Sequence, residues 1–85
     1  MSQPSLADFV GKITTGAIAT YVYLQSIAVN GEVVMSARII AENVKKSVAA
    51  VRDHLNELEK FGLLKREERH NEEGGKLSNR YRLLV

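Results

Sequence analysis

Three stretches of the chain place apolar residues at the spacing of an amphipathic helix. The apolar face of the first stretch consists of Ile18, Tyr21, Leu24 or Gln25, and Ile27-Ala28. Positions three, four and seven residues apart lie on one side of a helix, so this pattern predicts burial against a core. We expect the helix to begin at Thr15 and to stop at Asn30-Gly31, because both residue types tolerate the left-handed backbone that ends helices.

Serines mark the starts of the other two helices. Ser36 can cap a short helix from Ala37 to about Asn43 by accepting a hydrogen bond from the first turn. The inward residues of this helix are expected to be Ile40, Ala41 and Val44. Since only residues 44–46 separate Asn43 from the next capping serine, Ser47, a tight turn is expected to join the second helix to the third.

The third helix, predicted over residues 48–61, has the most regular pattern. Its apolar positions, at i, i+3, i+7 and i+10, are Val48, Val51, Leu55 and Leu58. Gly62 follows it and can take the left-handed conformation that ends a helix. The sequence therefore predicts a helix, a tight turn and a second helix over this central part of the chain.

Strands are predicted on either side of the helix pair. Glu32-Val33-Val34 is too short for a helix and rich in β-branched residues, which favours a brief strand. After Gly62, residues 64–69 and 79–84 flank a Gly74-Gly75 tip and predict a β-hairpin. Alternation in the second arm places Tyr81, Leu83 and Val85 on one face and Arg80, Arg82 and Leu84 on the other. Because its distal half is mostly polar, the hairpin is expected to project from the body.

The N-terminal residues carry a weaker pattern. After Pro4-Ser5, four apolar residues fall at helical spacing, namely Leu6, Phe9, Val10 and Ile13. This spacing fits either one short packed helix or a loose arm. We therefore divide the chain into an N-terminal arm or short helix, residues 1–14, and one domain, residues 15–85.

Two stretches of the domain resemble the winged helix-turn-helix family of DNA-binding proteins. "IIAENVKKSVAAVRDHLNELEKFGLLKRE" is similar to the turn, the recognition helix and the "LexxGLL" exit of that family, and "NRYRLL" resembles the returning strand of the wing. The resemblance covers roughly residues 15–85. It implies an α+β, mainly helical fold, in which a three-helix core is joined by a short strand and by a C-terminal β-hairpin, the wing.

The predicted turn departs from the family pattern at two positions. Lys45 stands where family members often have glycine, and Lys46 stands where they often have an apolar residue. If Lys45 takes the positive φ that glycine would supply, the backbone strain is of the order of 1 kcal/mol. We expect a somewhat looser turn than is usual in the family.

Charge is unevenly distributed along the 85 residues, whose formal net charge is +2. Residues 1–44 carry two basic and three acidic side chains, whereas residues 45–85 carry ten basic and seven acidic ones. The basic C-terminal half favours an anionic partner. The length suits one domain, and the absence of cysteine excludes disulfides, thiolate zinc sites and thiol catalysis. With no membrane-spanning run or leader pattern, we expect a cytoplasmic protein, associated with the nucleoid when bound to DNA.

The resemblance implies sequence-specific binding of double-stranded DNA by a small transcriptional regulator. The helix of residues 48–61 would read the major groove, and the wing would contact the backbone or the minor groove. Lys45, Lys46 and Ser47 would contact phosphates, and Arg52 or Asn56 would contact bases. The full set of predicted DNA-binding residues is Lys45, Lys46, Ser47, Ala49, Arg52, Asn56, Arg69, Lys76, Arg80 and Arg82.

Other partners and activities are predicted to be absent. His54 and His70 lack ligand-spaced partners, and no nucleophile, base and orienting group can be assembled, so we expect no metal, no cofactor and no enzymatic activity. No small-molecule ligand and no membrane partner are expected. A homodimer is expected, through the N-terminal segment and the first helix, because one short helix reads only a few base pairs.

Two alternative functions keep the same fold. The seven acidic residues among the basic ones of residues 45–85 are compatible with a module that docks on another protein. Similar C-terminal endings also occur in DNA-binding parts of plasmid or phage replication proteins.

Overall fold

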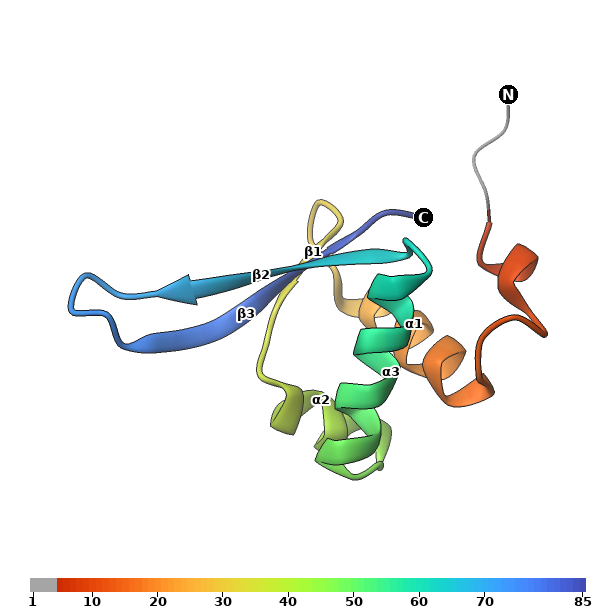
Figure 1. The fold of residues 1–85 in the computed structure, drawn as a ribbon, viewed down its shortest axis with the longest axis horizontal. Helices are drawn as coiled ribbons and strands as arrows, with labels where there is room; N and C mark the ends of the chain where they lie inside the picture. Colours follow the sequence, from red (N-terminus) through yellow and green to blue (C-terminus); the bar gives the residue numbers. More distant parts are fainter. Residues whose placement is uncertain (1–4) are drawn as a thin grey trace.

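The structure, a computed structural model, describes residues 5–85 except for the side chain of Lys76. In chain order the elements are the 3₁₀ helix η1 (Leu6–Phe9), α1 (Thr15–Ile27), β1 (Glu32–Val34), α2 (Ala37–Val44), α3 (Val48–Lys60), β2 (Leu64–His70) and β3 (Lys76–Leu83). The helices gather on one side of the hairpin root, and the rest of the β2–β3 hairpin extends away from them (Figure 1). The predicted order of helix, strand, helix, helix and hairpin is confirmed.

Both predicted serine caps are present. The Ser36 side chain accepts a hydrogen bond from the Ile39 N–H at 3.2 Å, and the Ser47 side chain accepts one from the Ala50 N–H at 3.0 Å. Each cap satisfies one of the backbone donors that a helix start leaves unpaired. At the other end of α3, Gly62 has φ +78°, as predicted.

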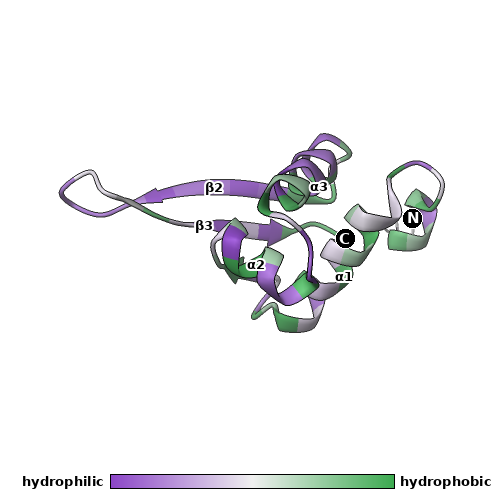
Figure 2. Cartoon of the chain, turned by 90° about the horizontal axis from the view of Figure 1, so that it is seen from below, coloured by the Kyte–Doolittle hydropathy of each residue, from purple (hydrophilic) through white to green (hydrophobic). Residues whose placement is uncertain are grey.

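The core lies between the three helices and one face of the sheet. Val51, Leu55 and Leu58 of α3 are at most 1% exposed, so the regular apolar pattern of this helix is confirmed. The buried side chains contributed by the other elements are Ile13, Ala17, Thr20, Tyr21, Leu24, Val33, Ile40, Ala41, Leu63, Leu64 and Tyr81. The hairpin beyond its root is largely hydrophilic (Figure 2). It contributes little to this core.

The sheet has the strand order β1-β3-β2, and both pairings are antiparallel. Tyr81 on the central strand is opposite Val33 of β1 and Arg66 of β2. Because directly opposed residues share a face and Tyr81 is buried, this row defines the face that meets the helices. The neighbouring positions Arg80 and Arg82 therefore lie on the outer face.

Asn30-Gly31 does not stop a helix, and that prediction is wrong. The helix α1 ends at Ile27, and Asn30 and Gly31 have φ of 54° and 75° in the turn of a small hairpin. The hairpin is closed by reciprocal 3.0 Å hydrogen bonds between the backbones of Val29 and Glu32. Two consecutive residues with positive φ are the requirement of a type I′ turn, for which Asn-Gly is the preferred pair.

The hairpin strands are longer than predicted, since β3 begins at Lys76 rather than Asn79. Asn71 organises the tip: its side-chain oxygen accepts from the N–H groups of Glu73 at 3.0 Å and Gly75 at 2.7 Å. A Cβ on Gly75 would approach the Asn71 side chain to 2.8 Å, so glycine lets that side chain fold over the turn. Hydrogen bonds to the Asn71 side chain, rather than apolar packing, therefore hold the tip of the hairpin together.

The N-terminal segment packs against the domain. Ile13 is buried, Leu6 and Phe9 pack against the core, and Val10 is 67% exposed. Glu57 of α3 accepts hydrogen bonds from the Thr14 N–H at 3.1 Å and the Thr14 hydroxyl at 2.8 Å. The described part of the segment, residues 5–14, contains one turn of 3₁₀ helix and packs on the core, which fits the short packed helix and not the loose arm.

Tyr21 ties α1 to the end of the hairpin. Its side chain is fully buried, its hydroxyl lies 3.0 Å from the carbonyl oxygens of Leu63 and Val85, and it accepts from the Val85 N–H at 3.1 Å. Burial raises the pKa of the Tyr21 phenol above its ordinary 10.0, and backbone hydrogen bonds from Val85 and Leu84 lower it in part. The Tyr21 side chain therefore stabilises the folded state most when its phenol is protonated and neutral.

Tyr21→Phe is expected to lower the free energy of unfolding by about 1–2 kcal/mol at neutral pH, because it removes hydrogen bonds from buried backbone groups. A raised folded-state pKa means that the unfolded chain loses this proton first, so the stabilisation is present below about pH 10 and is lost above it. The difference between wild type and variant should shrink in urea titrations carried from pH 8 to pH 11. Tyr23→Phe, at a half-buried position, is the matched control. A difference for Tyr21→Phe that is independent of pH would contradict this account.

Candidate nucleic-acid interface

The turn between α2 and α3 presents two lysines and the cap of α3. Lys45 has φ 59° and ψ 47°, which confirms the expected left-handed backbone at the position where glycine is common. The N–H groups of Lys45 and Lys46 both donate to the Ala41 carbonyl, so the turn is closed by hydrogen bonds despite its departures from the family pattern. Lys45, Lys46 and Ser47 are exposed, and neither lysine forms an ion pair with any described residue.

The exposed face of α3 continues from this turn along the helix. Its exposed residues are Ala49, Arg52, Asp53, Asn56 and Lys60. The helix places them opposite the buried Val51, Leu55 and Leu58, as the pattern predicted. Asp53 lies among them and carries the opposite charge, so the face is mixed and not uniformly basic.

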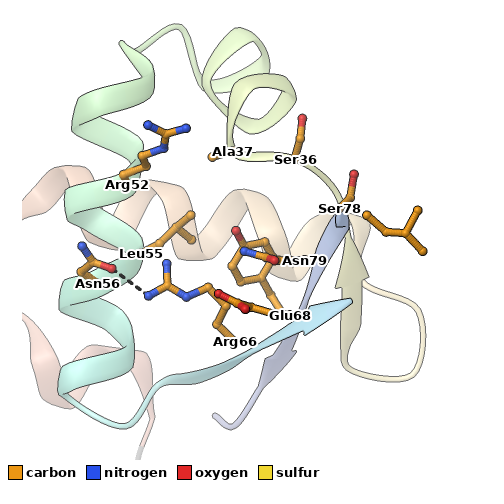
Figure 3. Close-up of a pocket in the computed structure, with 11 residues that line it drawn as sticks. Ser36, Ala37, Arg52, Leu55, Asn56, Arg66, Glu68, Ser78 and Asn79 are labelled. Carbon is orange, nitrogen blue, oxygen red and sulfur yellow. Dashed lines mark hydrogen bonds between the residues drawn. The ribbon is translucent and has the colours of Figure 1, made fainter. Parts of the chain in front are cut away.

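A groove of about 450 Å³ separates α3 and the start of α2 from the hairpin. Residues of α2, α3, β2 and β3 line it, and they include Arg52 and Asn56 from α3 and Arg66 from β2 (Figure 3). Leu55 and Tyr81 form its apolar part, and Ser78 and Asn79 of β3 line the opposite wall. Two of the predicted DNA-binding residues, Arg52 and Asn56, are therefore neighbours in one groove.

Arg66 connects the two walls of this groove and was missed in the sequence. Its Nη2 donates to the Asn56 Oδ1 at 3.0 Å and to the Glu59 Oε1 at 3.2 Å. Its backbone N–H donates to the Glu59 Oε2 at 3.2 Å. The alternation from the buried Leu64 would have placed Arg66 on the helix-facing side of β2, but a single strand does not reveal which helix residue it meets.

The predicted wing residues divide between the two faces of the hairpin. Arg69 is opposite Leu77, which lines the groove, and its Nη1 donates to the Ser78 carbonyl at 3.3 Å. The side chain of Lys76 lies outside the described residues. In the strand register, Arg69 therefore lies beside the groove.

Arg80 and Arg82 lie on the outer face of the sheet and are not brought together with α3. Arg80 pairs with Glu67 at 3.8 Å, and Arg82 pairs with Glu32 at 3.5 Å and with Glu67 at 3.3 Å. These partly exposed pairs bridge all three strands. The structure does not bring all the predicted DNA-binding residues onto one surface, because these two arginines face away from the groove and pair with glutamates.

Residues 5–85 contain neither a candidate metal site nor a helix that could span a membrane. This part of the chain contains no group of three or more His, Asp or Glu side chains that could hold a metal ion. None of its helices combines the length and the apolar character needed to cross a bilayer.

No model of a known protein family matches the chain, and no curated protein matches its sequence. Among solved structures, a "possible transcriptional regulator" from Methanosarcina mazei Go1 matches 94% of this chain with a TM-score of 0.67 and 14% sequence identity. The chain spans 63% of the length of that protein. Similarity at this level concerns the fold, and with the observed order of helices and strands it shows that the chain adopts a winged helix-turn-helix fold.

Proposed function

We propose that the protein binds double-stranded DNA sequence-specifically, as a small transcriptional regulator, with the exposed face of α3 in the major groove. The observation that carries the proposal is the continuous surface from Lys45 to Arg52, which has three basic side chains without ion-pair partners among the described residues. A helix start already attracts anions through its free N–H groups and its dipole. The similarity in fold to a possible transcriptional regulator supports the proposal.

Each part of this surface suits a different part of the duplex. Lys45, Lys46 and Ser47 surround the start of α3, where phosphate oxygens would accept their hydrogen bonds. Ala49 is small enough to let the helix backbone approach base edges, and Arg52 can reach a guanine through two hydrogen bonds. The proposed reading segment of α3 therefore runs from Ala49 through Arg52 to Asn56, the other predicted base contact.

The proposed role of the wing is restricted to its groove side. Arg69 remains a candidate for contacts with the flanking backbone or the minor groove, and Lys76, whose side chain lies outside the described residues, stays a prediction without a placement. Arg80 and Arg82 are left out of the proposed interface, because they lie on the outer face and pair with glutamates. The wing is thus expected to add weak, sequence-independent affinity.

A salt titration tests the proposal. Fluorescence anisotropy with a random duplex should give an affinity that falls linearly in log salt, because cationic side chains release counterions from the phosphates. Absent binding at low salt, or binding that does not respond to salt, would contradict it. That outcome would favour a protein-docking module, an alternative motivated by the ion pairs that occupy Arg66, Arg80 and Arg82.

Lys46→Ala is expected to weaken binding to every duplex alike and to reduce the slope of log affinity against log salt by about 0.9, the effect of one phosphate contact. The measurement is the same anisotropy titration on several unrelated duplexes. Lys12→Ala removes an equally exposed lysine from the N-terminal segment and should leave the slope unchanged. Equal slopes for wild type and Lys46→Ala would remove Lys46 from the interface.

Dimerisation through the N-terminal segment remains a prediction. The structure leaves less apolar surface for it than the sequence suggested, because Ile13 is buried and Leu6 and Phe9 pack against the core. The half-exposed Val22 of α1 and the exposed Val10 remain available. Sedimentation of the protein alone and with a selected duplex would give the stoichiometry.

A further inference from the structure

We propose that Arg66 is a positioning residue that sets the base preference of Asn56. This inference rests on the proposed function, and it assigns to the root of the wing a role in specificity. The two side chains come from β2 and α3 and meet in the groove, where the Arg66 Nη2 donates to the Asn56 Oδ1 at 3.0 Å (Figure 3). Asn56 is otherwise an exposed helix residue, free to rotate.

The bond from Arg66 selects one orientation of the Asn56 amide. A carboxamide has an acceptor oxygen on one side and a donor NH₂ on the other, and the two exchange places when the group flips. Guanidinium carries only donors, so the Oδ1 of Asn56 must face Arg66. The Nδ2 then faces away from this contact and offers two N–H donors to an acceptor such as a purine N7 in the major groove.

Glu59 fixes the Arg66 guanidinium beside Asn56. The carboxylate accepts from the Arg66 backbone N–H and from its Nη2, both at 3.2 Å. The Nη2 group has two hydrogens, so it can serve Glu59 and Asn56 at the same time. Arg66 is anchored through both its backbone N–H and its side chain, so it restrains Asn56 already in the free protein. Less conformational entropy of the Asn56 side chain is then lost when DNA binds.

The same pairing makes a direct phosphate role for Arg66 weak. Glu59 places a negative charge beside the guanidinium, and the two side chains are only 31% and 39% exposed. The Arg66–Glu59 pair therefore presents almost no net charge to a phosphate, whereas Lys45 and Lys46 each present a full positive charge. Arg66 should therefore affect which sequence is bound and contribute little to the salt dependence.

Selection from randomised duplexes tests this assignment. Asn56→Ala, at an exposed helix position, should relax the preference at one base pair by about five- to tenfold. Arg66→Met combined with Glu59→Gln keeps the net charge of the pair at zero. This double variant should lose preference at the same base pair by a similar factor, while the slope of log affinity against log salt stays unchanged. Adding Asn56→Ala to this double variant should cause no further loss at that base pair.

Two further variants separate positioning from charge and from general damage. Arg66→Lys keeps the charge, but the lysine side chain is shorter and does not reach the position of the Arg66 Nη2, so this variant should have a weaker preference at the same base pair. Arg82→Met combined with Glu32→Gln removes a matched ion pair from the outer face of the sheet and should leave the selected sequence unchanged. Thermal unfolding of each variant checks that it is folded.

The outcomes distinguish this inference from the proposed function. If the wild type binds and selects sequences while the Arg66→Met, Glu59→Gln double variant keeps the full preference, positioning by Arg66 is excluded and DNA binding stands. The inference would also be overturned if Arg66→Lys kept the full base preference. It would be overturned as well if the variants lost preference evenly over all positions of the bound sequence. If the wild type binds no duplex, the proposed function fails, and the inference fails with it.

Discussion

Replacing Leu58 with alanine is expected to lower the free energy of unfolding by about 3 kcal/mol, a large share of the 5–15 kcal/mol typical of a domain. Leu58 is fully buried in the core, and its backbone carbonyl also accepts the Leu63 N–H at 2.9 Å where α3 turns into β2. Truncation would leave a cavity beneath the proposed reading helix. Urea unfolding followed by circular dichroism measures the loss.

Leu84→Ala is the matched control for that variant. Leu84 is 50% exposed, and its backbone N–H donates to the Leu63 carbonyl whatever the side chain. The expected loss is below about 1 kcal/mol, because little apolar surface leaves water there on folding. Similar losses for the two variants would mean that α3 is not anchored through the apolar face described above.

Arg52→Ala is expected to reduce discrimination at one base pair by about 1–3 kcal/mol, or about 5- to 150-fold, while changing affinity for unrelated sequences much less. The reason is that a guanidinium can donate two parallel hydrogen bonds to a guanine edge, whereas alanine leaves those acceptors without a partner. Competition between a selected duplex and its single-base variants measures the effect. Arg52 is exposed, so the fold should survive the change.

Lys46→Ala supplies the comparison for Arg52→Ala. Losing a phosphate contact weakens all sequences alike, whereas losing a base contact weakens one sequence most. If the two variants have equal effects on every duplex, the assignment of Arg52 to a base and Lys46 to a phosphate is wrong.

Much of the fold could be predicted because local chemistry and the apolar pattern agree. Ser36 and Ser47 cap the helices they precede, and Val51, Leu55 and Leu58 are buried as their spacing requires. The positive φ at Lys45 could be anticipated from its place in the tight turn. These features depend on neighbours in sequence, so they are readable from the residues.

Features that depend on strand pairing or turn choice were less readable. Asn30-Gly31 suits both the end of a helix and a hairpin turn, and the pairing of β1 with β3 decides in favour of the hairpin. The length of the wing depends on Asn71, a side chain that folds over its own turn. Local patterns permit several such outcomes, and tertiary contacts select one.

The candidate site shows the same division. The sequence indicated Arg52 and Asn56, because the polar face of α3 follows from its period. It could not show that Glu67 and Glu32 pair with Arg80 and Arg82, since those pairs depend on the register of three strands. Arg66 was missed because its contacts depend on how β2 packs beside α3, which a single strand does not reveal.

The most direct test of the central claim is to map the bound surface residue by residue. A ¹⁵N-labelled sample would be titrated with a selected duplex while backbone amide signals are followed. The account predicts that shifts concentrate in residues 45–56 and at Arg66, and that Val34 and Arg82 on the outer sheet face stay unchanged. Shifts gathered on that outer face, with residues 45–56 unaffected, would contradict the claim that α3 and the preceding turn form the interface.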